Sequence, residues 1–115
     1  MTVKAPPPEK VKQVKIGGIL YRVEYIERLL NQEKAVKLNG HILYNPCLIM
    51  VESENDEQMQ KITVLHEILH GILTHAGIED DFEKQVEILA YGLFGVIQDN
   101  PDLMDWIRGP GGGQP

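Results

Sequence analysis

The chain has little of several features that would each define a class of protein. Its single cysteine, Cys47, cannot form an intramolecular disulfide, which is typical of proteins from a reducing compartment. No apolar run approaches the roughly 20 residues that a membrane-spanning helix needs. Residues 1–15 also lack the apolar core of a signal peptide. We therefore expect a cytoplasmic protein with no membrane partner.

Positive charge is also scarce. Eleven lysines and arginines against 17 acidic residues give a formal net charge of −6, so we expect neither a nucleic acid nor an anionic membrane as the main partner. The 115 residues, 43% of them hydrophobic, suffice for one domain with one core. We place this domain at residues 11–108, between a proline-rich arm (1–10) and a glycine-rich tail (109–115), both expected to be flexible.

What the chain does contain is His66-Glu67-Ile68-Leu69-His70, an H-E-x-x-H pattern. Positions i and i+4 of a helix project from one face, so both imidazoles can bind one ion, and neutral imidazole is a good zinc ligand. Glu67 can accept a proton from a water next to the metal. The pattern predicts metal-assisted hydrolysis, and the alternative is two surface histidines beside a solvated glutamate.

The flanking residues predict an amphipathic helix over about 57–75, ended at Gly77 and capped by Ser53 or Asn55. The two histidines lie on the border between an apolar arc and a polar stripe, as a metal site in a cleft requires. The arc contains Ile62, Val64, Leu65, Ile68, Leu69, Ile72 and Leu73, and the stripe contains Gln60, Thr63, Glu67, Gly71 and Thr74.

The rest of the chain predicts an α+β fold. Residues 11–16 and 19–25 form a hairpin around Gly17-Gly18, and residues 24–31 become a short helical or irregular link. Further strands are expected at 36–44, broken by a turn, and at 47–51, either buried or along the cleft. A second helix, capped by Asp80 or Asp81, covers 82–98, and residues 103–107 pack back on the core. We expect a small N-terminal antiparallel sheet against the motif helix.

Two histidines rarely hold a catalytic zinc alone, so a third ligand is expected. His75 lies half a turn round the same helix and faces away. Glu87 is better placed, just beyond the apolar arc of the second helix, where an antiparallel partner would bring it to the metal. Glu83, one turn earlier, is the rival, although acids in a first turn are also explained by the helix dipole.

The motif His66-Glu67-Ile68-Leu69-His70, followed by Glu87-Ile88-Leu89-Ala90 on the next helix, resembles the ImmA/IrrE family of small zinc metallopeptidases, especially its short phage and mobile-element members. The resemblance covers about residues 11–101. It implies a zincin-like fold with zinc ligands His66, His70 and Glu87 and the general base Glu67. It also implies a protein substrate such as a transcriptional repressor, since known relatives cleave repressors.

The chain departs from that family in two ways. Tyr91 stands where larger relatives usually carry asparagine, and we expect no separate DNA-binding or sensory domain of the kind that many relatives carry. The alternative function is therefore a catalytically silent zincin-fold module that grips a protein partner. Peptide hydrolysis also needs a donor for the developing oxyanion, for which the candidates are Tyr21, Tyr25, Tyr44 and Tyr91. We expect Cys47 to be a buried structural thiol and His41 to be structural or at the surface.

Overall fold

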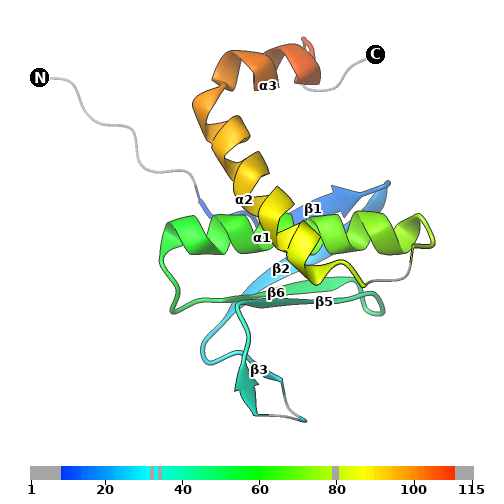
Figure 1. Cartoon of the computed structure of the whole chain (residues 1–115), viewed down its shortest axis with the longest axis vertical. Helices are drawn as coiled ribbons and strands as arrows, with labels where there is room; N and C mark the ends of the chain where they lie inside the picture. The colour runs from blue at the N-terminus through cyan, green and yellow to red at the C-terminus, as the bar shows by residue number, and fades with distance from the viewer. Residues whose placement is uncertain (1–8, 32, 34, 79–80, 111–115) are drawn as a thin grey trace, which may run out of the picture.

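The computed structural model describes residues 9–31, 33, 35–78 and 81–110. Figure 1 shows a β-sheet, a long helix lying along it, and two further helices that extend away from the sheet. The predicted α+β class is confirmed. The expected arm and tail lie mainly outside the described residues. The strands are β1 (Gln13–Ile16), β2 (Ile19–Ile26), β3 (Leu30–Asn31), β4 (Val36–Lys37), β5 (Gly40–Leu43) and β6 (Leu48–Glu52), and the helices are α1 (Glu57–His75), α2 (Glu83–Asp99) and α3 (Pro101–Arg108).

The main sheet has four strands in the order β1-β2-β6-β5. β1 and β5 pair antiparallel with β2 and β6, but the central strands β2 and β6 run parallel. The predicted purely antiparallel sheet is therefore wrong. Hairpin signals in the sequence identify only neighbouring strands, whereas the β2–β6 pair joins strands separated by more than twenty residues and by the β3–β4 hairpin.

The turns follow the glycine pattern only in part. Gly17 and Gly18 have positive φ and connect β1 to β2 as predicted. The link after β2 is not helical, because β2 continues to Ile26 and a turn then leads into β3. Cys47 lies in the turn before β6 rather than in the strand, with a φ of 65° that is unusual for a residue with a side chain.

Helix α1 has the predicted bounds, and backbone groups at both of its ends form capping hydrogen bonds. Its N-cap is Asp56, not Ser53 or Asn55, and the Asp56 carboxylate accepts a hydrogen bond from the Met59 N–H. At the other end Gly77 has positive φ, and the Ile78 N–H donates to the Leu73 carbonyl. This is the pattern of a Schellman cap, so the predicted stop at Gly77 is confirmed.

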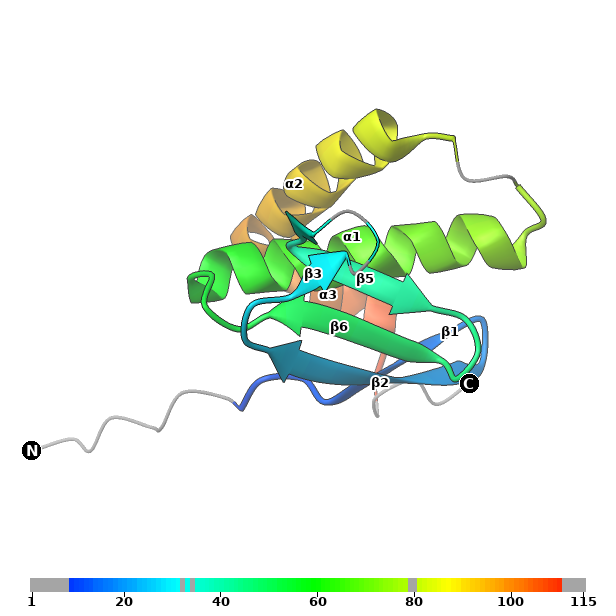
Figure 2. The same cartoon turned by 90° about the horizontal axis from the view of Figure 1, so that it is seen from below.

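Helix α1 is covered on two sides, by the sheet and by α2 (Figures 1 and 2). Its predicted polar stripe does not face solvent, because Gln60, Thr63 and Glu67 are buried. The Gln60 amide donates to the Ser53 and Asn55 carbonyls, and the Thr63 hydroxyl donates to the Met59 carbonyl. These bonds offset the cost of burying the donors, whereas the Gln60 Oε1 atom is buried without a hydrogen bond. The predicted apolar arc is split between the two sides, and Ile72 within it is exposed.

Two cores result from this arrangement. The larger core lies between α1 and the sheet, and the smaller one lies between α1 and α2. The fully buried side chains of the larger core include Tyr21, Ile49 and Val51. The smaller core is built from Ile62, Ala90 and Phe94, with Leu65 and Leu69 packed against it.

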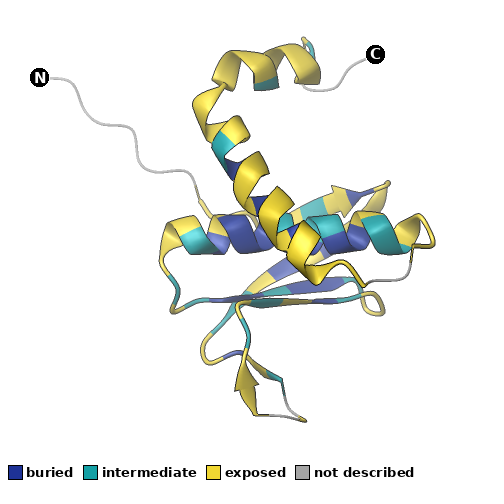
Figure 3. Cartoon of the chain, in the orientation of Figure 1, coloured by how far each residue is buried: buried dark blue, intermediate teal, exposed yellow. Residues whose placement is uncertain are grey.

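The last two helices behave differently from the sequence prediction. Helix α2 begins at Glu83, and its N-cap Phe82 makes no side-chain capping bond, so Asp81 is not the cap and Asp80 lies outside the described residues. Helix α3 was expected to pack on the core, but none of its residues is buried and it contacts only α2 among the described elements (Figure 3). Its apolar side chains therefore remain on the surface.

Glu52, at the end of β6, is a buried carboxylate whose contribution to stability should depend on pH. It accepts hydrogen bonds from the Glu54, Leu29 and Arg28 N–H groups, which hold its pKa below the usual range against the opposing effect of burial. Because the pKa is lower in the folded state, the ionised Glu52 stabilises the fold at any pH above the unfolded-state pKa. This stabilisation is lost as the pH falls through the folded-state pKa.

We therefore expect the Glu52→Gln variant to melt at a lower temperature than the wild type at pH 7. The difference should shrink on acidification below about pH 4.5, where the unfolded carboxyl becomes protonated. Melting curves of both proteins from pH 7 to pH 3 test this. A difference that stays constant across the range would contradict the account.

Candidate metal centre

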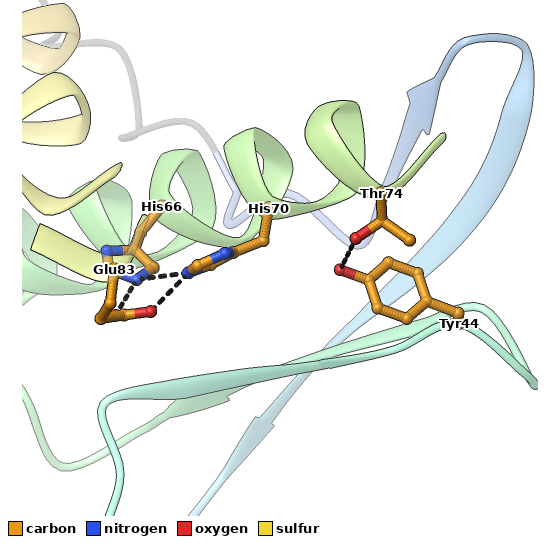
Figure 4. A network of polar contacts seen from close by, with 5 residues as sticks. All are labelled: Tyr44, His66, His70, Thr74 and Glu83. Carbon is orange, nitrogen blue, oxygen red and sulfur yellow. Dashed lines mark hydrogen bonds and ion pairs between the residues drawn. The ribbon is translucent and has the colours of Figure 1, made fainter. Parts of the chain in front are cut away.

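The two histidines of the motif converge at one point on α1. His66 and His70 lie one turn apart, and their Nε2 atoms are 3.0 Å apart. The His70 side chain is only 6% exposed and the His66 side chain 18%, and both line one cleft. Figure 4 shows both rings directed to the same side of the helix.

A carboxylate from α2 completes the cluster. Glu83 places Oε1 2.7 Å from the Nε2 atom of His66 and Oε2 2.8 Å from the Nε2 atom of His70 (Figure 4). Glu83 is the first residue of α2, and its side chain is 71% exposed, so the third member of the cluster lies at the mouth of the site. The candidate ligand atoms of these three residues all lie within 4.8 Å of one another.

This donor set fits a zinc ion. Two imidazole nitrogens and one carboxylate form the His₂Glu set of open catalytic zinc sites. Bonds of about 2.0 Å at tetrahedral angles separate neighbouring ligand atoms by about 3.3 Å. The observed separations of 2.7 to 3.0 Å are a few tenths of an ångström shorter, so an ion between the three groups would need only small side-chain movements.

The other two candidates for the third ligand lie elsewhere. Glu87 is exposed and lines the same cleft, but it does not belong to the group of converging ligand atoms. His75 faces away from the site, as predicted, and its Nε2 atom is 2.8 Å from the Tyr21 hydroxyl. The structure thus brings Glu83 to the histidines where the sequence favours Glu87.

The position of Glu83 follows from the packing of α2. The buried residues of α2 are Val86, Ala90 and Phe94. The side of α2 that faces the core is therefore centred closer to Phe94 than the apolar arc that the sequence predicts. On a 100° wheel Glu83 lies next to the centre of this side, one turn before Val86, and Glu87 lies on its flank. A carboxylate at the start of the buried side can reach over to α1 without being buried itself.

Glu67 is about as buried as His70. It is 6% exposed, lines the same cleft as the two histidines, and lies against β5. Gly40 makes room for it, because a Cβ atom on Gly40 would lie 3.1 Å from Glu67 Oε2 and 2.4 Å from Thr63 Cγ2. The absence of a side chain at Gly40 therefore lets α1 approach β5 closely. Nothing in the sequence marked Gly40 for this role, because the Asn39-Gly40 pair is typical of a turn.

The cleft has a volume of about 560 Å³. Its walls are residues 37–42 and Tyr44 from the β4–β5 segment, the first half and middle of α1, and the first three turns of α2. Tyr44 and Tyr91 line the cleft, and the Tyr44 hydroxyl accepts a hydrogen bond from Thr74 (Figure 4). These two tyrosines are therefore the ones that can reach a bound molecule, and His41 lines the cleft as well.

The remaining tyrosines have structural roles. Tyr21 is buried against His75, and burial, followed by the charges of Cys47 and Tyr44, raises its pKa. The Tyr25 hydroxyl donates to the Val11 carbonyl, and partial burial raises its pKa. Neither lines the cleft, so neither is a candidate for stabilising an oxyanion there.

Cys47 is half-buried, and its thiol donates to the Tyr44 carbonyl, which agrees with a structural role. The sequence predicts a strand at residues 47–51 that is either buried or lies along the cleft. The corresponding strand β6 is central, paired with β2 on one side and β5 on the other, so it cannot present an edge to a ligand. The edge strand beside the cleft is β5.

Comparisons of the chain with protein-family models, with curated proteins and with solved structures find no match. No described helix combines the length and apolarity needed to cross a membrane.

Proposed function

We propose that this chain is a zinc-dependent metalloendopeptidase with the ImmA/IrrE-like, zincin-type organisation that its sequence resembles. The observation that carries the proposal is the convergence of His66 Nε2, His70 Nε2 and the Glu83 carboxylate within 4.8 Å, with the Glu67 carboxylate buried in the same cleft. A closed structural site would use four protein ligands and would need no additional carboxylate.

A zinc ion held there would polarise a substrate carbonyl and make a neighbouring water more acidic. Glu67 then has two tasks, to accept the proton of the attacking water and to pass it to the leaving amine. Its burial beside Gly40 and Thr63 restricts its side chain and keeps bulk water away from the carboxylate. Tyr44 and Tyr91 are the tyrosines that line the cleft, and we propose their hydroxyls as donors for a developing oxyanion.

The substrate class follows from the wall of the cleft. β5 pairs with β6 on one side only, and its residues line the cleft. Because the Glu52 N–H donates to the Asn39 carbonyl, the alternation of the antiparallel ladder turns the N–H and C=O groups of Gly40 and Ile42 away from β6. An extended peptide can pair with that edge, which favours a protein segment in strand conformation as the substrate. By resemblance, a phage or mobile-element repressor is our choice of substrate.

Removal of zinc provides the first test. We expect zinc added to the metal-depleted protein to raise the melting temperature, because a ligand that binds only the native state stabilises it by about 2.7 kcal/mol at a hundredfold excess over its Kd. The same addition should restore cleavage of a pool of unstructured peptides that chelator abolishes. Mass spectrometry of the pool identifies the cleaved bonds.

The two readouts separate the possible outcomes. Zinc-dependent stabilisation without cleavage of any peptide would favour the alternative, a silent module that grips a protein partner. A melting temperature unaffected by zinc and chelator would overturn the metal site itself.

A further inference from the structure

Helices α2 and α3 leave a large apolar surface uncovered within the described chain. Only three residues of α2 and none of α3 are buried, although half of the exposed large apolar side chains of the described chain lie on these two helices (Figure 3). Trp106 is 81% exposed, Ile107 65% and Ile88 63%. A helix that is apolar around its circumference is normally covered on more than one side, and an eight-residue helix such as α3 is marginal without packing.

The side of α2 opposite Ala90 carries a defined set of residues, which we call the outer face. In chain order these are Gln85, Ile88, Leu89, Gly92, Gly95, Val96 and Asp99, all of them exposed except the half-buried Gly95. The outer face points away from α1, since Val86, Ala90 and Phe94 occupy the side packed on that helix. It lies apart from the cleft, which α2 lines with Glu83, Glu87 and Tyr91.

The outer face is nearly palindromic about Gly92. Seven residues before and after it stand the polar Gln85 and Asp99, and four residues before and after it stand the β-branched Ile88 and Val96. A two-fold symmetric interface requires a patch that is complementary to itself. We propose that the outer face of α2 pairs antiparallel with the outer face of a second copy of this chain.

Glycine on the axis allows the two helices to approach closely. A Cβ atom built on Gly92 or on Gly95 would meet no heavy atom within 4 Å, so both positions are open on the surface. In the antiparallel register Leu89 of one copy lies opposite Gly95 of the other, where the missing side chain leaves a depression. The side chains at a crossing set the separation of packed helices, and glycine permits the short end of the range.

The charges also favour this pairing. Each chain carries a net charge of −6, but Asp99 is the only charged residue of the outer face. Antiparallel pairing places each Asp99 opposite Gln85, whose amide can donate to the carboxylate. Parallel pairing would place the two Asp99 carboxylates side by side, which is unfavourable.

Exposed apolar side chains are available for such an interface. α2 contributes Ile88, Leu89 and Val96, and the neighbouring α3 carries the exposed Leu103, Trp106 and Ile107. A standard interface buries roughly 800 Å² per partner. The aromatic Trp106 provides the kind of large, exposed anchor that contributes most to such interfaces.

Sedimentation of the full-length chain over a wide concentration range tests the proposal. We expect a monomer–dimer equilibrium that Ile88→Glu weakens at least about tenfold, because it buries a charge without a partner. Ile72→Glu is the matched control, since Ile72 is an exposed apolar residue of α1 outside the outer face, and it should leave the equilibrium unchanged. Gly92→Leu should also weaken the dimer while circular dichroism shows an intact monomer, because the position has open space.

Cysteine cross-linking fixes the direction of the pairing. In a Cys47→Ser background, a mixture of Ile88→Cys and Val96→Cys proteins should form mixed disulfides in preference to like pairs. Preferential like pairs would overturn the antiparallel arrangement. A wild-type chain that remains monomeric at every concentration, or an Ile72→Glu variant that dissociates as readily as Ile88→Glu, would overturn the interface.

Discussion

Replacing Glu67 by glutamine is expected to lower peptide cleavage by about 10²- to 10⁴-fold while leaving zinc bound, because the loss is that of a general base. Glutamine has nearly the same shape and can occupy the space beside Gly40 and Thr63. It cannot accept the proton of the attacking water. The ligand atoms of His66, His70 and Glu83 are not altered, so zinc content and zinc-dependent stabilisation should remain near the wild-type values.

The control for this variant is Glu57→Gln, on the same helix. Glu57 is exposed, and its carboxylate pairs only loosely with Lys61 at 3.8 Å, an interaction of little energetic value. Cleavage by this variant should equal that of the wild type. If Glu67→Gln binds zinc and cleaves the peptide pool at the wild-type rate, Glu67 is not the base and the hydrolytic mechanism is wrong.

The sequence alone predicts the motif helix well, and the reason is local. The limits of α1 depend on nearby signals: polar residues just before residue 57 and a glycine at 77 that adopts positive φ. The cap itself is Asp56 and not the predicted Ser53 or Asn55, so the sequence locates the start of the helix but not the capping residue. The hairpin around Gly17-Gly18 is predicted for the same reason. The parallel pairing of β2 with β6 depends on contacts between distant segments, and no turn signal encodes it.

The polar stripe of α1 illustrates a second limit. A wheel assigns polar residues to solvent, but Gln60, Thr63 and Glu67 are buried. Gln60 donates to carbonyls of the loop before α1, Thr63 donates to a carbonyl of α1 itself, and Gly40 of β5 leaves space for Thr63 and Glu67. Hydrophobic periodicity cannot separate a buried polar network from a solvated face, since both consist of polar residues at helical spacing. At the candidate site, such burial of a polar residue is itself a functional signal.

The choice between Glu83 and Glu87 as the third ligand depends on how α2 is rotated about its own axis relative to α1. The sequence-based arc includes Leu89, Leu93 and Val96, which in the structure are exposed. If the outer face contacts a second chain, Leu89 and Val96 are apolar for a reason unrelated to α1. The apolar arc of α2 would then contain residues of two different interfaces. For this reason the centre of the arc does not predict which side of α2 faces the metal cluster.

Glu83→Ala is expected to weaken zinc binding more than about a hundredfold, since loss of a direct ligand should exceed the 10- to 100-fold effects seen when residues supporting a ligand are removed. A hundredfold loss corresponds to about 2.7 kcal/mol of binding free energy. Glu87→Ala, one turn further along α2 and also exposed in the cleft, should change the affinity by less than about threefold, because its carboxylate lies outside the converging group. Competition against a fluorescent zinc chelator measures both affinities.

Glu83→Ala and Glu87→Ala together decide which of the two carboxylates is the third zinc ligand. The family resemblance assigns the third ligand to Glu87, whereas the distances of 2.7 and 2.8 Å to the two imidazoles favour Glu83. A large loss in Glu87→Ala with little change in Glu83→Ala would show that zinc binding draws α2 forward by one turn and would restore the assignment made from the sequence. Comparable large losses in both would indicate that the two carboxylates share the ion, with Glu83 at the mouth of the cleft and Glu87 one turn behind it.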